Sequence, residues 1–107
     1  MEFVDYDSLS DEEIIRRIQE GDKPGIDYLM EKYKYLVRSK AKTLFLIGGD
    51  KDDLIQEGMI GLYKAIRDYQ ADKDSSFFNF ADLCVSRQIH SAIKASNRKK
   101  NIPLNTY

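Results

Sequence analysis

Apolar residues recur along this chain at steps of three and four, and this spacing narrows the possible folds more than any other feature. It places side chains on one side of an α-helix, whereas a half-buried strand alternates at every second position. No segment shows a convincing strand alternation, repeat or low-complexity tract. The sequence therefore predicts an all-α fold, a compact bundle of about four helices with short loops.

Capping signals position the first two helices. Ser10 and Glu13 have capping-box spacing and Gly21 can end a helix, so we expect a helix over residues 11–20. A second helix is expected as one long rod over about residues 22–46, with a proline tolerated in its first turn. Its apolar side would consist of Ile26, Leu29, Met30, Tyr33, Val37, Ala41 and Leu44.

Two further helices follow the glycine pair at 48–49. Acidic residues with capping spacing open a helix over about residues 50–69, and after a polar loop at 70–76 we expect the last helix over 77–97. Pro103 fits a chain that is extended by then. The buried sides of these two helices would be Leu54, Ile55, Met59, Leu62 and Ile66, and then Phe77, Ala81, Val85, Ile89 and Ile93.

The composition argues against a metalloprotein and an exported protein. Cys84 is the single cysteine and His90 the single histidine, so neither an internal disulfide nor an ordinary zinc site can form. The first residues are acidic rather than basic, and no apolar run approaches the roughly 20 residues that span a bilayer. We therefore expect no metal, no membrane partner and a cytoplasmic location.

The formal net charge of −1 hides two oppositely charged ends. Residues 1–31 hold ten acids against three basic residues. Residues 86–107 hold only basic charged side chains, so this end should attract a polyanion unless it is simply a solvated tail.

The sequence contains only incomplete versions of known phosphate-binding and calcium-binding motifs. Residues 48–51 are rich in glycine but lack the Lys-Ser/Thr pair of a phosphate loop, and the segment from Asp72 lacks the glycine and closing acid of a calcium loop. The acids from Asp50 to Glu57 fit capping of a helix better than binding of a cation. We therefore expect no cofactor and no enzymatic activity.

A polar stripe is predicted on the outer side of the third helix. Helical spacing places it opposite the buried side, with an apolar residue among polar ones. Gly58 and Gly61 each cost the helix about 1 kcal/mol, which the close approach of another backbone would explain. Carboxylates around an apolar spot suit a basic partner helix, although such a stripe can also be merely solvated. The stripe comprises Asp53, Gln56, Glu57 and Ile60.

Aromatic residues gather where the last loop meets the last helix. Phe77 belongs to the predicted core, but Phe78 and Phe80 cannot both share its side of the helix, so at least one should be exposed. An exposed ring beside a basic helix is suited to stacking on unpaired bases, at roughly 1 to 3 kcal/mol per base.

These motifs resemble region 2 of the main bacterial sigma factor family. The resemblance rests on the run Asp53 to Gly58, its spacing to Phe77-Phe78-Asn79-Phe80-Ala81, and the ending Ile102-Pro103-Leu104. It extends from about Leu9 to Tyr107. The chain is most similar to the sigma-H branch of sporulation and stationary-phase factors, through Phe45 to Gly48, Gly58 to Lys64, Leu83-Cys84 and Arg87 to Ile89.

The resemblance implies a domain that binds core RNA polymerase and recognises and melts the minus-ten promoter element. Asp53, Gln56 and Glu57 match contacts to the arginine-bearing clamp helices of the largest subunit, and Ile60 would add an apolar contact. Phe80 matches the ring that stacks on a flipped adenine of the non-template strand. Tyr69 and Gln70 border the same pocket, and Phe78 and Asn79 lie beside it in sequence.

The chain departs from the housekeeping pattern at the upstream edge of the bubble. Leu83-Cys84 replaces a tryptophan pair, and a smaller wedge should melt DNA less readily. Arg87 and His90 take the two positions that read the duplex, and because arginine favours guanine we expect a G·C pair there. The phosphate contacts would come from Lys94, Arg98, Lys99 and Lys100.

Two other functions fit part of this pattern. A helical regulator of duplex DNA would also carry a basic helix, and a protein-interaction bundle would bury every ring and use the basic end for solubility. We expect residues 1–9 to be a flexible segment, 10–101 the helical domain, and 102–107 the start of a linker to a second domain, the chain being a fragment. An anti-sigma factor is a further candidate partner that the sequence does not identify.

Overall fold

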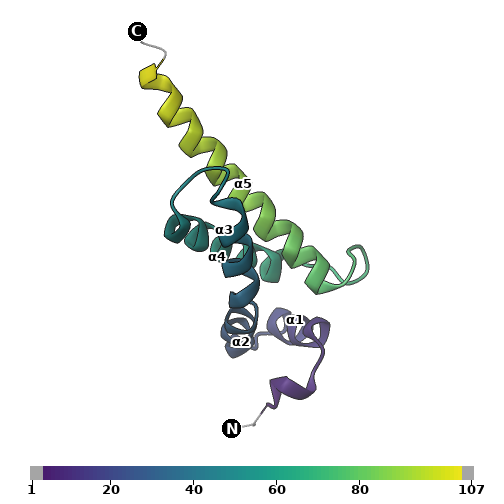
Figure 1. Ribbon diagram of the computed structural model, residues 1–107. Coiled ribbons are helices and arrows are strands. Elements are labelled where there is room, and N and C mark those ends of the chain that lie inside the picture. The colour runs from purple at the N-terminus through teal and green to yellow at the C-terminus, as the bar shows by residue number, and fades with distance from the viewer. Residues whose placement is uncertain (1–3, 105–107) are drawn as a thin grey trace.

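The computed structural model describes residues 4–104 and the side chains of residues 4–97. These residues form one short 3-10 helix and five α-helices, with no strand among them (Figure 1). The all-α prediction is confirmed, but the number of helices is five rather than about four. The elements are η1 (Tyr6–Ser8), α1 (Asp11–Gln19), α2 (Pro24–Lys32), α3 (Lys34–Leu44), α4 (Lys51–Asp68) and α5 (Phe77–Leu104).

The predicted long second helix is divided at Tyr33, so that prediction was wrong. Tyr33 has φ −97° and ψ 7°, outside the α-helical region, and its carbonyl accepts from the Leu36 amide at 3.0 Å, a step of three residues. The Tyr33 ring is buried and its hydroxyl donates to Asp11 of α1. Because the apolar spacing continues in phase across Tyr33, α2 and α3 look like one helix in the sequence.

The predicted N-caps are confirmed. The Ser10 hydroxyl accepts from the Glu13 amide at 3.1 Å, and the Asp50 carboxylate accepts from the Asp52 amide at 2.8 Å. Both bonds satisfy amides that have no partner inside their helix. Gly21 ends the first helical segment with φ 109°, a left-handed conformation that glycine adopts without steric cost.

The core is formed where α4 packs along α5, with α3 against both. The predicted inner side of α5 is buried at every position, and on α4 Leu54, Leu62 and Ile66 are buried while Ile55 and Met59 are half-buried against the core. The helix pair therefore presents one outer side of α4 and one outer side of α5 to the surroundings (Figure 1).

Gly58 and Gly61 allow the helices of this chain to pack closely. The interpretation that they make room for a partner molecule is therefore corrected. A Cβ on Gly61 would lie 2.8 Å from the Cys84 carbonyl oxygen and 3.1 Å from the Val85 Cα of α5. A Cβ on Gly58 would lie 2.7 Å from Val37 Cγ1 of α3. Both glycines are buried, so the close approach is that of the chain's own helices.

The start of α5 is fixed by three other segments. The Phe77 amide donates to the Glu12 carboxylate of α1 at 2.8 Å, and the Asn79 amide donates to the Ser76 hydroxyl at 3.2 Å. The Tyr69 hydroxyl, at the end of α4, donates to the Ser75 carbonyl at 2.7 Å. One distant contact, to Glu12 of α1, and two local ones thus hold the start of α5 in place.

The far end of α5 differs from the prediction. The helix continues to Leu104, past both the expected end at Asn97 and Pro103, so the expectation of an extended chain there was wrong. Proline fixes φ near the helical value, but inside a helix it removes one hydrogen bond and crowds the carbonyl four residues earlier. α5 runs beyond the other helices, and the molecule measures 64 × 26 × 21 Å (Figure 1).

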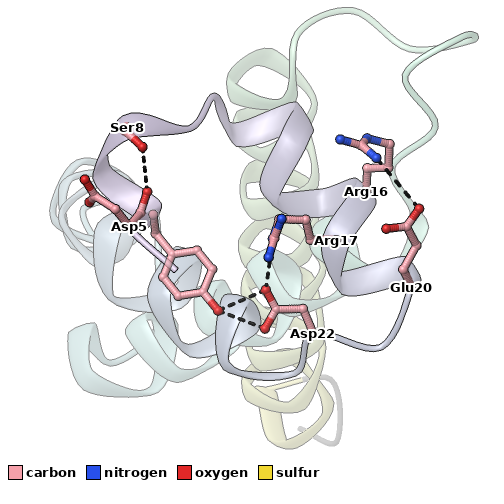
Figure 2. A network of polar contacts seen from close by, with 7 residues as sticks. Asp5, Ser8, Arg16, Arg17, Glu20 and Asp22 are labelled. Atoms are coloured by element: carbon pink, nitrogen blue, oxygen red, sulfur yellow. Dashed lines mark hydrogen bonds and ion pairs between the residues drawn. The ribbon is translucent and has the colours of Figure 1, made fainter. Parts of the chain in front are cut away.

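Residues 5–8 are packed onto α1 and α2 by a polar network. The Tyr6 hydroxyl donates to Asp22 at 2.8 Å, and Arg17 Nε lies 3.4 Å from the same carboxylate (Figure 2). Tyr28 donates to Asp7 at 2.6 Å, and this bond raises the pKa of Tyr28 to about 12. The domain boundary at residue 10 remains a prediction, but the packed contacts begin before it.

Candidate functional site

The outer side of α4 carries the predicted polar stripe. Asp53 and Gln56 are exposed, and Ile60, about one turn after Gln56, is 45% exposed. Tyr63, one turn beyond Ile60, is also exposed and enlarges the apolar spot. Tyr63 was not predicted from the sequence, although its spacing of three from Ile60 was a usable signal.

Glu57 differs from its neighbours because it leans toward α5. It is half-buried, and its Oε1 accepts from Gln88 Nε2 at 2.9 Å. Nothing in the sequence pointed to Gln88, since the pair is brought together only by the packing of two helices.

A groove of about 500 Å³ lies beside this stripe, between the start of α4 and the middle of α5. Its α4 wall carries three carboxylates, from Asp50, Asp53 and Glu57, and its α5 wall carries small side chains such as Ala92 and Ala95. The acidic wall gives this side of the molecule a negative potential that suits a cationic partner.

The three phenylalanines at the start of α5 have different environments. Phe77 is fully buried, Phe80 is half-buried, and Phe78 is 44% exposed. The prediction that at least one ring is exposed is confirmed. Phe78 also contacts the buried Tyr33 ring, with 6.1 Å between centroids. One part of the Phe78 ring is therefore packed, and the rest is exposed.

Tyr69 is a core residue, which corrects its placement among the base-stacking residues. It is 2% exposed, and its ring lies between Phe77 and Phe80 at centroid distances of 5.5 and 5.6 Å. In this arrangement the Tyr69 ring cannot stack on a base, and it supports Phe80 instead.

Tyr69 and Gln70 nevertheless border a second groove, of about 470 Å³, between α1 and the loop after α4. Arg16 and Gln19 line it from α1, and Gln19 donates to the Tyr69 carbonyl at 3.2 Å. Phe80 does not line this groove, so the structure does not join Phe80 and Gln70 in a single pocket.

The outer side of α5 that contains Phe80 continues along the helix as a cationic stripe. Phe78 lies roughly 180° around the helix from Arg87 and does not belong to this stripe. Leu83, Arg87, His90 and Lys94 are all exposed and follow one another at steps of four, three and four. These steps place them along one side of the helix. The other predicted phosphate contacts, Arg98, Lys99 and Lys100, lie outside the side chains that the structure describes.

The two residues at the predicted wedge differ in accessibility. Leu83 is exposed, whereas Cys84 is half-buried against the core. Burial raises the pKa of the Cys84 thiol, which keeps it neutral. Leu83 is therefore the accessible side chain of this pair.

α3 presents a further surface that sequence analysis did not single out. Tyr35 is exposed, and Arg38 and Lys42 follow it on the solvent side of the helix. Lys40 pairs with Asp82 of α5 at 2.9 Å and so ties the two helices together. The absence of any acid between Lys34 and Leu44 was a readable signal of a cationic surface.

The helical domain with these two outer surfaces matches a known class of protein module. Residues 29–99 match the family model for Sigma-70 region 2, and the chain belongs to this family. Sigma factors are transcription initiation factors rather than enzymes, so the non-enzymatic prediction is confirmed with the family prediction.

Particular relatives are similar over most of the chain. The RNA polymerase sigma-H factors of Bacillus subtilis (strain 168) and Bacillus licheniformis are each 54% identical over 99 residues, which is 92% of this chain and 45% and 44% of theirs. The RNA polymerase sigma-F factor of Bacillus subtilis (strain 168) is 33% identical over 82 residues, 77% of this chain and 32% of that protein. The predicted likeness to the sigma-H branch is confirmed, and the chain spans less than half the length of these relatives.

No helix in residues 4–104 is both long and apolar enough to cross a membrane. In the same part of the chain, no three His, Cys, Asp or Glu side chains are grouped so that they could hold a metal ion.

Proposed function

We propose that this chain is the promoter-recognition domain of a sigma factor, which binds core RNA polymerase and recognises and melts the minus-ten element during transcription initiation. Membership of the Sigma-70 region 2 family and the similarity to sigma-H factors support the proposal. We expect it to act in the cytoplasm on promoters of a sporulation or stationary-phase programme, and an anti-sigma factor to be a candidate regulator.

The polymerase partner is proposed to bind the outer side of α4. Arginines of the clamp helices would pair with Asp53 and Glu57, Gln56 would hydrogen-bond, and Ile60 would fill an apolar contact. Exposure of Asp53, Gln56 and Ile60 supports this assignment. Arginine suits such a site because its planar guanidinium binds carboxylates through two parallel hydrogen bonds.

Promoter DNA is proposed to bind along the cationic stripe of α5 and around the start of this helix. Phe78 and Phe80 would stack on unpaired bases of the non-template strand, with Asn79 and Gln70 beside them. Lys94, with Arg98, Lys99 and Lys100, would hold phosphates. Unpairing a base costs a few kcal/mol, which stacking of roughly 1 to 3 kcal/mol together with phosphate contacts can offset.

One observation carries the proposal more than any other. Arg87, His90 and Lys94 are exposed along the side of α5 that contains Phe80, while the exposed Asp53 and Gln56 lie on α4. A chain that must hold a polymerase and an unpaired strand at once needs two such surfaces.

The first experiment is a pull-down of core RNA polymerase with the wild type and with Glu57→Lys. Reversing this charge should abolish capture, because the lysine would repel the arginines of the clamp. Glu31→Lys, which reverses an exposed carboxylate on α2, is the matched control and should retain capture. Equal capture by both variants would contradict the polymerase surface.

The two alternative functions are separated by comparing forked and fully paired promoter DNA. The proposed domain should prefer the forked DNA, a duplex regulator should prefer the paired DNA, and a protein-interaction bundle should bind neither. Exposure of Phe78 and of the cationic stripe favours the first outcome.

Arg87 is proposed to read a G·C pair at the upstream edge of the bubble, with His90 beside it. Arg87→Ala should remove the preference for G·C at that position, worth about 1 to 3 kcal/mol, in a series of promoter variants. An unchanged preference would show that the residue reads no base.

A further inference from the structure

Gln88 of α5 is held at both ends of its side-chain amide. Its Nε2 donates to Glu57 Oε1 at 2.9 Å, and its Oε1 accepts from Lys64 Nζ at 3.2 Å. A carboxylate can only accept and an ammonium can only donate, so one orientation of the amide alone satisfies both partners. The side chain therefore has a defined position between two charged residues of α4.

The stem of Gln88 is held as firmly as its amide. Gln88 is half-buried, and a Cβ placed on Gly61 would lie 2.9 Å from Gln88 Cβ. The close approach of α4 and α5 at Gly61 thus brings Gln88 into reach of Glu57. A longer distance between the helices would leave Glu57 without this partner.

The hydrogen bond fixes one oxygen of Glu57 and leaves the other available. Within the described residues, Glu57 Oε2 makes no hydrogen bond. The Gln88 amide also stands between the Glu57 carboxylate and the Lys64 ammonium, which would otherwise compete for it. Glu57 lines the acidic groove of about 500 Å³, whereas Lys64 lines a separate groove of about 220 Å³ with Arg87.

We propose that Gln88 is a positioning residue for polymerase binding: it holds the Glu57 carboxylate beside the acidic groove with one oxygen free for a guanidinium group of the partner. This inference rests on the proposed function and extends it to a residue of the DNA-facing helix. A glutamate that is already ordered loses less rotamer freedom when it binds. Removing the amide should therefore weaken binding by about three- to ten-fold.

Gln88→Met tests this role, because methionine keeps the length and packing of the stem and removes both hydrogen bonds of the amide. The affinity of the whole chain for core RNA polymerase would be measured for Gln88→Met, Glu57→Ala and the double variant, at a salt concentration where all three bind. Gln88→Met should weaken binding by about three- to ten-fold alone, and by less than about two-fold in the Glu57→Ala background, where no carboxylate is left to position.

Gln19→Met is the matched control. Gln19 also donates a hydrogen bond between segments, to the Tyr69 carbonyl at 3.2 Å, but does not touch Glu57. It should leave the polymerase affinity unchanged, which separates a loss of positioning from a general loss of stability.

The outcomes distinguish this inference from the function on which it rests. If Glu57→Lys abolishes capture while Gln88→Met binds like the wild type, the positioning role is wrong and the polymerase surface stands. The same conclusion follows if Gln88→Met weakens binding equally with and without Glu57→Ala. If Glu57→Lys itself binds normally, both proposals are overturned.

Discussion

The outer side of α4 and the first turns of α5 both expose side chains, but they do so for different reasons. On α4, helical spacing alone decides that Asp53, Gln56 and Ile60 face outward. On α5, three neighbouring rings are sorted by contacts with Tyr33 and Tyr69. A surface set by spacing should tolerate substitution, whereas a surface set by tertiary contacts should depend on residues that never reach the solvent.

The largest effect is expected for Phe77→Ala, which removes the fully buried ring below the aromatic surface. Loss of a large core side chain should lower the free energy of unfolding by about 3 to 5 kcal/mol. Chemical denaturation measures this, with Ile60→Ala on α4 as the comparison. If both variants lose the same stability, the contrast between the two surfaces fails.

Phe78→Ala should affect DNA binding more than stability. The ring is 44% exposed, so its removal leaves most of the core intact. Loss of one stack should weaken binding to forked promoter DNA by about 1 to 3 kcal/mol. Ile60→Ala, which also removes a partly exposed apolar side chain, should leave that affinity unchanged. A DNA affinity that is insensitive to Phe78 would remove the ring from the proposed base contacts.

The inner side of α4 gives a third comparison, between Gly61→Ala and Gly58→Ala. At Gly61 the added methyl would meet backbone atoms of Cys84 and Val85, at 2.8 and 3.1 Å, which cannot move without displacing α5. Overpacking should outweigh the gain in helix propensity and cost about 1 to 2 kcal/mol. At Gly58 the contacts are side-chain atoms of Val37 and Ile89, and thermal unfolding should show a smaller loss.

As the pH rises, the start of α5 should lose stability at a lower pH than the polar stripe on α4. Burial and the bond to Asp11 raise the pKa of Tyr33 above its ordinary value of 10.0. A raised pKa in the folded state means that the stabilisation is complete below about pH 10 and is lost as the pH rises through the higher folded-state pKa. Tyr33→Phe should be less stable at neutral pH by about 1 kcal/mol and should lose less stability above pH 10.

A steeper alkaline loss in Tyr33→Phe than in the wild type would reverse this sign and contradict the assignment. The measurement is the denaturation midpoint as a function of pH, with tyrosine absorbance followed in parallel.

The smallest effect is expected for Lys94→Ala, on the outer side of α5. Loss of one phosphate contact should reduce the slope of log affinity against log salt by about 0.7 to 0.9 and leave the sequence preference unchanged. Lys51→Ala, an exposed lysine at the start of α4, should leave the slope as it is. Equal changes for the two lysines would mean that general charge, rather than the α5 stripe, attracts DNA.

Much of the fold could be predicted because it depends on local rules. Ser10 and Asp50 are caps that act within one turn, and the inner side of α5 repeats at helical spacing. The break at Tyr33 could not be predicted, because the apolar spacing stays in phase through it. The continuation past Asn97 was missed, because the helix was predicted to end there and Pro103 was interpreted as part of a chain already extended.

The candidate site was predictable to the same extent. The α4 stripe follows from spacing, and so does the exposure of one ring among Phe77, Phe78 and Phe80. The burial of Tyr69 and the bond between Glu57 and Gln88 depend on segments far apart in sequence. Gly61 illustrates the difference. Its cost to helix stability was recognised from the sequence, but the backbone that approaches it was expected to belong to another molecule and belongs to α5 of this chain.

The unbroken course of α5 makes it a ruler. From Phe80 to Lys94 the backbone is a single helix, so the Cα atoms of these two residues are separated by about 21 Å along the helix axis. No hinge or loop can adjust that interval. If promoter DNA binds both residues as proposed, its first unpaired base and the phosphate that Lys94 binds must lie at a matching distance. The length of α5 between these two residues would then help to set where the two DNA strands separate.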